Sequence, residues 1–525
     1  SQYSDTPPPD PFRLAYTHSQ TSTSRITMQA RPYAGNIRTE GPKHGLVSKG
    51  VMRRTTGSRV ARVCAGRGVV SASAAVSESR VSSVGAPGVL SVKEHHHQLR
   101  AKVVSMMPEG SVIYLEGGEA VRRNGMDVFY DYRPDSDFFY LTGCAEPGFG
   151  ALIDTVTGKY TLLSAKVPDE MLHWVGALPT LEQLAEEYGA DDCAYMDDAP
   201  RLLKACDAPV IHSLPDKIGD AAEEAITAMR GMVNTSVLPK KLMESREFKS
   251  GSEIACLQVA SDVSSDAHRA VIRAARGTSF EYQLQSVFLN TTVGAGLKHV
   301  GYPAIIGAGR NSAILHYDRN NGPIQPHDVV LMDAGSEYRC YTADITRTFP
   351  AGGRFSPEMA DVYDAVLAIQ TLALEKIRPG ASWEEVTMDS RRLLAQLLLD
   401  LKLTKGSVDA IVDMGVDKLF MPHGLGHFLG LDVHDMDGGG NPIPSGLLPG
   451  HVVTCEPGMY FVDSLLEPAL ADGRKAELLN ADRVRGMFPF GGVRIEDNVA
   501  IMAESVHNLT SVPKTRADIE ELARS

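Results

Sequence analysis

Acidic residues end or interrupt apolar, strand-like runs in the second half of the chain, and this pattern restricts the possible folds more than any other. Val329–Asp333 runs apolar into a carboxylate, and the chain turns at Gly335-Ser336 and returns through Tyr341–Arg347. A carboxylate at the end of a buried strand is costly unless its charge has a partner. The hairpin brings Asp344 near Asp333, so the two could share a cation. Either aspartate alone is also typical of a turn cap.

Two glutamates follow the same pattern further along the chain. Glu456 follows the apolar run Val452–Cys455 and precedes a Pro-Gly pair. Glu496 lies in a run where a period of two sets it on the same face as Arg494. Each glutamate alone could be a surface-pointing position of a half-buried strand.

Histidine is concentrated in the segment Met421–Asp435. It contains His423, His427 and His434, three of the sixteen histidines of the chain, among glycines that would let the backbone approach a ligand closely. A single histidine here would be typical of a satisfied core residue, but three with this glycine pattern indicate a site.

Four carboxylates and at least one imidazole on neighbouring strands would form an oxygen-rich site. Such donors suit Mn²⁺ or Co²⁺ better than a structural zinc, which prefers Cys and His. Because four carboxylates exceed the charge of one ion, we expect a pair of divalent ions about 3.5 Å apart, bridged by carboxylates and a hydroxide.

The alternation of apolar runs and helical patterns predicts the domain organisation. From about residue 91, short runs such as 112–115 and 160–163 alternate with helical segments such as 181–188, which indicates an α/β layer domain. Ser250 and Glu253 form a capping box that opens a helix, so we place the boundary of a second domain just before it. The predicted division is 1–90, 91–242 and 243–525.

The second domain mixes long helices with strand pairs. Ser356-Pro357-Glu358 begins a helix whose apolar stripe is Met359, Val362, Tyr363, Val366 and Ile369. Strands are expected at 328–334, 340–349, 451–461 and 492–502. Helices packed on a largely antiparallel sheet would make this domain α+β.

The first 90 residues differ in charge from the rest. Residues 1–93 have a net charge of +9, whereas residues 94–525 have a net charge of −22. An Arg- and Ser-rich, acid-poor extension is typical of a transit peptide, so we expect a plastid or mitochondrial location. If the extension is instead disordered without an address, the location would be cytoplasmic. The acidic remainder argues against nucleic-acid binding, and no run approaches 18 apolar residues, which argues against a membrane span.

In order and spacing, the motifs together resemble the prolidase family, the Xaa-Pro dipeptidases among the pita-bread metallopeptidases, which also include aminopeptidase P. The motifs that carry the resemblance are Asp333, Asp344, His423–His427, His434-Asp435, Glu456–Gly458 and Gly492–Glu496, with Tyr132–Gly143 and Glu146–Gly148 in the first half. The resemblance implies an α+β pita-bread catalytic domain preceded by a smaller α/β N-terminal domain. It also implies hydrolysis of the peptide bond before proline in di- or oligopeptides.

Carried over residue by residue, the resemblance implies a metal-ligand set and a set of catalytic residues. The implied ligands of two divalent ions, Mn²⁺ first and Co²⁺ or Zn²⁺ as alternatives, are Asp333, Asp344, His427, Glu456 and Glu496. His316 and His434 would position the substrate and the tetrahedral intermediate, His423 and Arg494 would lie behind them, and Glu456 would also carry a proton. A homodimer through the N-terminal domain is implied as well, with Trp174 reaching the active site of the partner subunit.

One departure from the family bears on specificity. Prolidases carry, between the last histidine and the Glu-Pro-Gly motif, an insert with an arginine that holds the dipeptide carboxylate, but residues 435–455 contain no Lys or Arg. Two alternatives therefore remain: an Xaa-Pro aminopeptidase acting on longer peptides, and a non-catalytic pita-bread binding protein. The tract His95–His97 resembles a metal-binding sequence, but we expect a solvated surface run.

Overall fold

The computed structural model describes residues 88–525 except 207, 216–217, 220–221, 223–231, 436–442 and 444–445. The predicted transit peptide or disordered extension over residues 1–90 lies almost wholly outside the described residues. Among the helices of the described part, none is long and apolar enough to cross a membrane.

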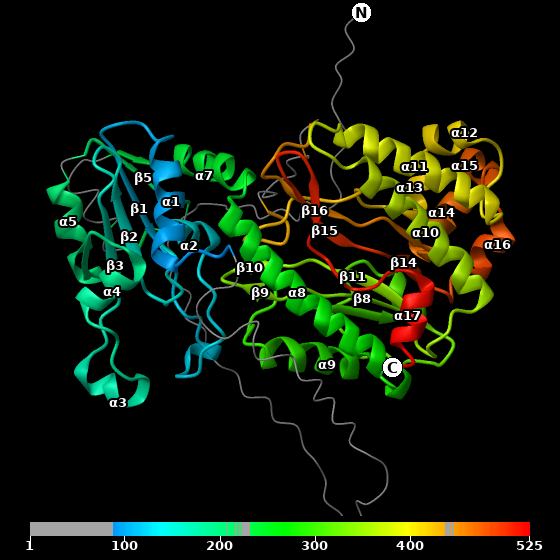
Figure 1. Ribbon diagram of the computed structural model, residues 1–525, viewed down its shortest axis with the longest axis horizontal. Helices are drawn as coiled ribbons and strands as arrows, with labels where there is room; N and C mark the ends of the chain where they lie inside the picture. The colour runs from blue at the N-terminus through cyan, green and yellow to red at the C-terminus, as the bar shows by residue number, and fades with distance from the viewer. Residues whose placement is uncertain are drawn as a thin grey trace, which may run out of the picture. The chain divides into compact units, whose positions relative to one another are not determined.

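The first part of the described chain is built on a six-stranded mixed sheet in the order β4-β3-β2-β1-β5-β6 (Figure 1). Neighbours β1–β2 and β2–β3 are antiparallel, whereas β3–β4, β1–β5 and β5–β6 are parallel. The strands are β1 Val112–Glu116, β2 Gly150–Asp154, β3 Tyr160–Ser164, β4 Asp192–Tyr195, β5 Val210–His212 and β6 Met232–Asn234.

Helices pack on both faces of this sheet, because separate groups of buried residues lie on each side. Leu99, Val103 and Phe138 belong to one group, and Leu203 and Ile211 belong to the other. The helices are α1 Val92–Val104, α2 Ser136–Thr142, α3 Leu172–Val175, α4 Leu181–Tyr188, α5 Ala199–Ala205 and α7 Val237–Glu247, with short 3₁₀ turns η1 Arg123–Gly125, η2 Asp169–Met171 and η3 Met196–Asp198. The strands predicted at 112–115 and 160–163 and the helix predicted at 181–188 are confirmed.

Helix α7 crosses the predicted boundary between residues 242 and 243. Its Leu238 and Leu242 are buried in the same apolar group as Leu99 of α1. The division of the chain at residues 90 and 242 stays a prediction.

The second part begins with α8, which is capped as the sequence predicts. The Ser250 hydroxyl accepts from the backbone N–H of Glu253, and the Glu253 carboxylate accepts from the backbone N–H of Ser250. The helices are α8 Gly251–Ala274, α9 Glu281–Gly294, α10 Pro357–Lys376, α11 Trp383–Asp400, α12 Val408–Asp413, α13 Asp417–Phe420, α14 Asp463–Ala471, α15 Gly473–Glu477, α16 Ala481–Gly486 and α17 Arg516–Leu522, with 3₁₀ turns η4 Ala275–Gly277 and η5 Gly309–Ala313.

Antiparallel ladders form the centre of this part, and in Figure 1 they lie between the pair α8–α9 and the pair α10–α11. The stripe predicted for α10 is buried at all five positions. The strands are β7 Ile305–Ala308, β8 Val329–Asp333, β9 Glu337–Tyr338, β10 Tyr341–Thr342, β11 Thr346–Pro350, β12 Val452–Cys455, β13 Gly458–Tyr460, β14 Gly492–Arg494, β15 Asp497–Ile501 and β16 Val506–Asn508. The four predicted strand regions are confirmed, but three of them are interrupted, each next to a carboxylate.

The prediction that His95–His97 is a solvated run is wrong for two of the three residues. His95 and His96 are 3% and 1% exposed, because they lie on the inner face of α1. The His95 ring lies 2.8 Å from the Ser252 hydroxyl of α8 and 3.3 Å from the Tyr341 hydroxyl of β10. His95 therefore joins α1 to the second part of the chain, whereas the His96 ring lies 3.1 Å from the Tyr140 carbonyl oxygen of α2.

Candidate metal centre

The two aspartates meet at the end of a strand pair. Asp333 is the last residue of β8 and pairs with Thr346, the first residue of β11. Asp344 lies two residues before Thr346, in the break between β10 and β11. Gly335 permits this crossing, since a Cβ there would lie 1.8 Å from the Ala343 carbonyl oxygen. The Tyr302 hydroxyl donates to Asp333 Oδ1 at 2.5 Å and reaches Asp344 Oδ1 at 2.6 Å, which fixes the spacing of the carboxylates.

The two glutamates occupy matching breaks in a second strand pair. The β12–β15 ladder ends at the pair Cys455 and Asp497, and the β13–β14 ladder begins at the pair Gly458 and Arg494. Glu456 and Glu496 lie between these ladders, one on each strand. Both side chains leave the regular pleat at the same level, so they can face a common centre.

His427 lies beside this break with one ring nitrogen directed at the carboxylates. Its Nε2 is 3.3 Å from Asp344 Oδ2 and 3.6 Å from Glu456 Oε1. Its Nδ1 lies 2.9 Å from the Phe428 carbonyl oxygen, a contact that places the proton on Nδ1 in the neutral ring. Nε2 is then left with a lone pair, which is the tautomer that a metal ligand needs.

Gly426 holds the histidine segment against β12. A Cβ at Gly426 would lie 2.0 Å from the Thr454 carbonyl oxygen. The His427 amide donates to the Thr454 hydroxyl, and the Thr454 amide donates to the His427 carbonyl. Gly426 is therefore needed for close packing of the histidine segment on β12, and the approach of a ligand to these glycines stays a prediction.

Burial and mutual repulsion perturb the acidic groups of the cluster. Burial raises the pKa of Asp333 to about 6, although Arg494 opposes it, and burial raises the pKa of Glu456 to about 7. Burial together with the neighbouring Asp344, Glu456 and Asp333 raises the pKa of Glu496 well above its ordinary value. In the protein without metal, these carboxyl groups therefore tend to hold protons that a divalent cation could displace.

Asp344 and His427 shift in the opposite sense. Burial favours the neutral form of Asp344, but its contacts with His427, Tyr302 and Arg494 outweigh burial and lower its pKa. Burial likewise opposes protonation of His427, but Asp344 and Glu456 raise its pKa to about 9. The imidazolium thus acts as the cation of the cluster in the protein alone.

The donor set fits a metal ion. The ligand atoms of Asp344, His427 and Glu496 all lie within 4.8 Å of one another. The Tyr302 hydroxyl links Asp333 to Asp344 of this group, and Glu456 Oε1 lies 3.6 Å from His427 Nε2. Carboxylate oxygens with one imidazole suit a hard or borderline divalent ion.

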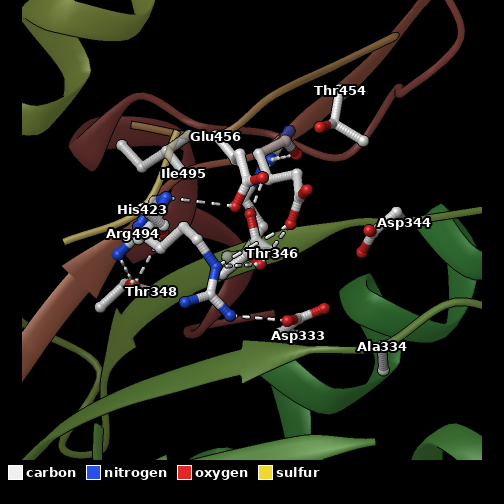
Figure 2. Close-up of polar contacts among 12 residues, drawn as sticks. Asp333, Ala334, Asp344, Thr346, Thr348, His423, Thr454, Glu456, Arg494 and Ile495 are labelled. Atoms are coloured by element: carbon white, nitrogen blue, oxygen red, sulfur yellow. Dashed lines mark hydrogen bonds and ion pairs between the residues drawn. The ribbon is translucent and has the colours of Figure 1, made fainter. Parts of the chain in front are cut away.

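Arg494 directs its guanidinium at Asp333, as Figure 2 shows. Its guanidinium donates to Asp333 Oδ2 at 2.6 Å, to the Thr346 hydroxyl at 2.9 Å and to the Tyr460 hydroxyl at 2.9 Å. The Thr346 hydroxyl in turn donates to Glu496 Oε2 at 2.7 Å. Arg494 therefore orients carboxylates from both strand pairs.

The remaining histidines lie at different distances from this cluster. His423 Nε2 is 2.9 Å from the Tyr460 hydroxyl, and His423 Nδ1 is 3.7 Å from Glu456 Oε2. Burial, with Arg494 nearby, lowers the pKa of His423 to about 4, so this ring is neutral. The exposed His434 packs edge to face on His427, with ring centroids 4.4 Å apart. His316 is exposed on the segment between η5 and β8.

Sequence reasoning missed three hydroxyl groups of the site, those of Tyr302, Thr346 and Tyr460. Thr346 could have been found, because a period of two in the predicted strand region 340–349 places it on the same face as Asp344. Tyr460 lies two residues past the Pro-Gly pair on β13. Tyr302 lies in irregular chain before β7, where no pattern marks it.

Comparison with known proteins gives family matches over both parts of the chain. Residues 255–503 match metallopeptidase family M24, and residues 96–210 match the aminopeptidase P N-terminal domain. The Xaa-Pro dipeptidase of Homo sapiens is 36% identical over 438 residues, which are 78% of this chain and 88% of that protein. A probable Xaa-Pro aminopeptidase of Pyricularia oryzae is 34% identical over 83% of this chain and 97% of that protein.

Solved structures give the same result for the fold. A variant of Escherichia coli aminopeptidase P in complex with substrate has a TM-score of 0.74 and 30% identity, covering 83% of this chain and 99% of that one. The zinc-substituted form of that enzyme in complex with product has a TM-score of 0.73 with the same coverage. The predicted fold class, an α+β pita-bread domain preceded by a smaller α/β domain, is confirmed.

Proposed function

The chain belongs to metallopeptidase family M24, and on this premise we propose that it is a metal-dependent peptidase that hydrolyses the bond before proline, with Xaa-Pro dipeptides as preferred substrates. The observation that carries the proposal is the convergence of the ligand atoms of Asp344, His427 and Glu496 within 4.8 Å in a member of this family. A non-catalytic binding protein would have no need of five potential ligands held by a second layer of hydrogen bonds.

The proposed ligands of the metal ions are Asp333, Asp344, His427, Glu456 and Glu496. Four carboxylates carry a formal charge of −4, which two divalent ions neutralise, so we propose a pair of ions with Mn²⁺ as the physiological metal and Co²⁺ or Zn²⁺ as substitutes. When bound, such a pair activates a water molecule at neutral pH and polarises the scissile carbonyl group.

Glu456 is the proposed proton carrier. Its two oxygens face His427 and His423 respectively. A carboxylate placed between these groups can take a proton from the attacking water and give it to the leaving imino nitrogen.

The other polar groups are proposed to hold the substrate and the developing charge. His316 and His434 are exposed, and in this proposal they would bind the peptide and the tetrahedral intermediate. Neutral His423, held by Tyr460, would face the peptide, and Arg494 would keep the carboxylates oriented. The proline ring has no N–H and constrains the backbone, which explains why a dedicated site is needed.

A homodimer through the N-terminal domain is proposed as well. Trp174 on α3 is 74% exposed, and Leu172 and Val175 beside it are also exposed. A large apolar side chain at this exposure is typical of an interface. Sedimentation of the wild type and of Trp174→Ala would test this proposal, because the variant should shift toward the monomer.

The preference between dipeptides and longer peptides depends on residues 435–455, which contain no Lys or Arg. Without a charge-assisted partner worth about 1.5–3 kcal/mol for the dipeptide carboxylate, the advantage of a dipeptide over a tripeptide shrinks by about tenfold to a hundredfold. We therefore propose that Gly-Pro is the better substrate but that Gly-Pro-Ala is also cut.

The test is release of glycine from Gly-Pro and from Gly-Pro-Ala by protein loaded with Mn²⁺, with chelated protein as the control. We expect metal-dependent cleavage of both peptides, with rates within about two orders of magnitude of each other. Cleavage of the tripeptide alone would favour the aminopeptidase alternative. No cleavage of either peptide by the loaded protein would refute the proposed activity.

A further inference from the structure

The shape of the loop 428–435 holds together two histidines, His427 just before the loop and His434 near its end. The Asp435 amide donates to the Phe428 carbonyl at 3.1 Å, and the Gly430 amide donates to the Asp432 carbonyl at 3.2 Å. His427 directly precedes the loop, His434 lies at its end, and their ring centroids are 4.4 Å apart. A change in the loop therefore moves one ring relative to the other.

Arg246 of α7 binds this loop from outside the metal centre. Its guanidinium donates to Asp432 Oδ2 at 2.6 Å, to Asp137 Oδ1 at 2.8 Å and to Asp435 Oδ1. The Arg246 side chain is 9% exposed and that of Asp435 is 1% exposed, so these charges interact with little solvent screening. Lys249 Nζ lies 2.8 Å from the second oxygen of Asp435.

A second set of contacts anchors the same loop to the first residue of α2 and to the segment just before it. Arg133 donates to the Leu431 carbonyl at 2.6 Å, and the Ser136 hydroxyl donates to Asp432 Oδ1 at 2.6 Å. Asp137, which Arg246 also binds, belongs to α2. These anchors of the loop thus come from residues 133–137 and α7, while the candidate ligands come from the ladders of the second part.

The anchored loop has little freedom to adopt another shape. A Cβ at Gly430 would lie 2.4 Å from Asp435 Oδ2, so the carboxylate fills the space beside the glycine. The Gly430 carbonyl accepts from the Thr342 amide at 3.0 Å, close in sequence to Asp344. The planar guanidinium of Arg246 binds both carboxylates of the loop, Asp432 and Asp435, together with Asp137 of α2.

We propose that Arg246 is a positioning residue of the peptidase, which sets the place of His434 relative to His427 by holding Asp432 and Asp435 against α2. The inference rests on the proposed function, in which His434 contacts the substrate. Arg246 binds Asp137, Asp432 and Asp435, none of which is a candidate metal ligand, so it acts through the loop. By this arrangement the N-terminal part of the chain takes part in the geometry of the catalytic site.

The test compares Arg246→Gln with the wild type and with Lys241→Gln, a partly exposed position on the same helix whose side chain pairs with Glu244. We expect Arg246→Gln to lower kcat for Gly-Pro by about 100-fold, the cost of a misplaced group of this kind, with the metal content per chain unchanged. Lys241→Gln should keep the wild-type kcat. Arg246→Lys, which keeps the charge but not the planar fork, should lie between Arg246→Gln and the wild type.

A cycle with His434→Ala shows whether Arg246 acts through that histidine. In the His434→Ala background, adding Arg246→Gln should change kcat by no more than about twofold, the margin for sites that share one effect. A full additional loss in this background would overturn the proposal, and so would an unchanged kcat in the single Arg246→Gln variant.

Hydrogen exchange gives a readout that does not depend on activity. In Arg246→Gln the amides of residues 430–435 should exchange faster, whereas those of α8 and β8 should not change. If the wild type fails to cut Gly-Pro, the proposed function is wrong and exchange alone decides whether Arg246 holds the loop. If Arg246→Gln does not fold, Asp137→Asn removes one partner of the guanidinium and should show the same changes on a smaller scale; unchanged loop exchange in Asp137→Asn would refute the link to α2.

Discussion

Replacing Asp333 with asparagine should separate the stability of the metal-free protein from its capacity to bind metal. Burial raises the pKa of Asp333 to about 6 from an ordinary value of 3.8. A pKa raised by this amount corresponds to about 3 kcal/mol lost from the free energy of unfolding once the pH is above the folded-state pKa. Asparagine resembles the protonated carboxyl group, so this loss should disappear in the variant.

The gain in stability of the metal-free protein should come with a loss of metal affinity. Asparagine removes one of four negative charges and the charge-assisted acceptor of Arg494. Since loss of a group that merely supports a ligand weakens metal binding by about 10- to 100-fold, loss of a ligand should cost at least about 100-fold. Hydrolysis of Gly-Pro should fall in parallel.

The assay measures urea unfolding of the chelated and the Mn²⁺-loaded protein at about pH 8, with metal binding followed by calorimetry. Asp409→Asn is the matched control, because Asp409 is 70% exposed and pairs with Arg392 on the surface. A chelated Asp333→Asn variant less stable than the wild type would refute the electrostatic reasoning. Full activity with bound metal would refute the assignment of Asp333 as a ligand.

Three further predictions concern protons, packing and location. The chelated wild type should gain stability as the pH falls from about 8 to about 6, because the folded-state pKa values of Asp333, Glu456 and His427 are all raised. The Mn²⁺ affinity measured by calorimetry should weaken over the same pH range, because protons compete with the metal for the ligands. Gly426→Ala should lower the free energy of unfolding by about 1–3 kcal/mol and weaken metal binding, because its Cβ would lie 2.0 Å from the Thr454 carbonyl oxygen. Gly424→Ala is the control and should be near neutral, because the nearest atom to its Cβ would be 3.7 Å away. Equal effects of the two substitutions would contradict this explanation. A fusion of residues 52–90 to a fluorescent protein should enter a plastid or mitochondrion, and a diffuse cytosolic signal would count against a transit peptide.

The strand pattern and the four candidate carboxylates could be predicted from the sequence because their signals are local, whereas the choice of His427 among the three histidines of its segment came from the family resemblance. An apolar run that ends in Asp333, or that is interrupted at Glu456, is visible within a few residues. The sequence did not show that the interruptions at Glu456 and Glu496 lie at the same level of two paired strands. That register depends on pairing between segments about 40 residues apart, and no local pattern reports it.

Contacts between distant segments account for what sequence reasoning missed or misjudged. Tyr302 bonds to two aspartates that lie 31 and 42 residues away. Arg246 binds carboxylates 109 and 189 residues away. His95 and His96 were expected in solvent because a polar run usually lies on a surface, but α1 packs them against α2 and α8. The sequence of a short polar run does not show whether an element far away in the chain will bury it.

Catalysis by two metal ions can be tested by titrating the fully chelated protein with Mn²⁺, with Gly-Pro hydrolysis and bound metal measured at each step. We expect no hydrolysis in the metal-free protein and a rise in activity that levels off at two Mn²⁺ per chain, as four carboxylates require for neutrality. Hydrolysis that persists in the metal-free protein, or bound Mn²⁺ without any hydrolysis, would contradict this expectation.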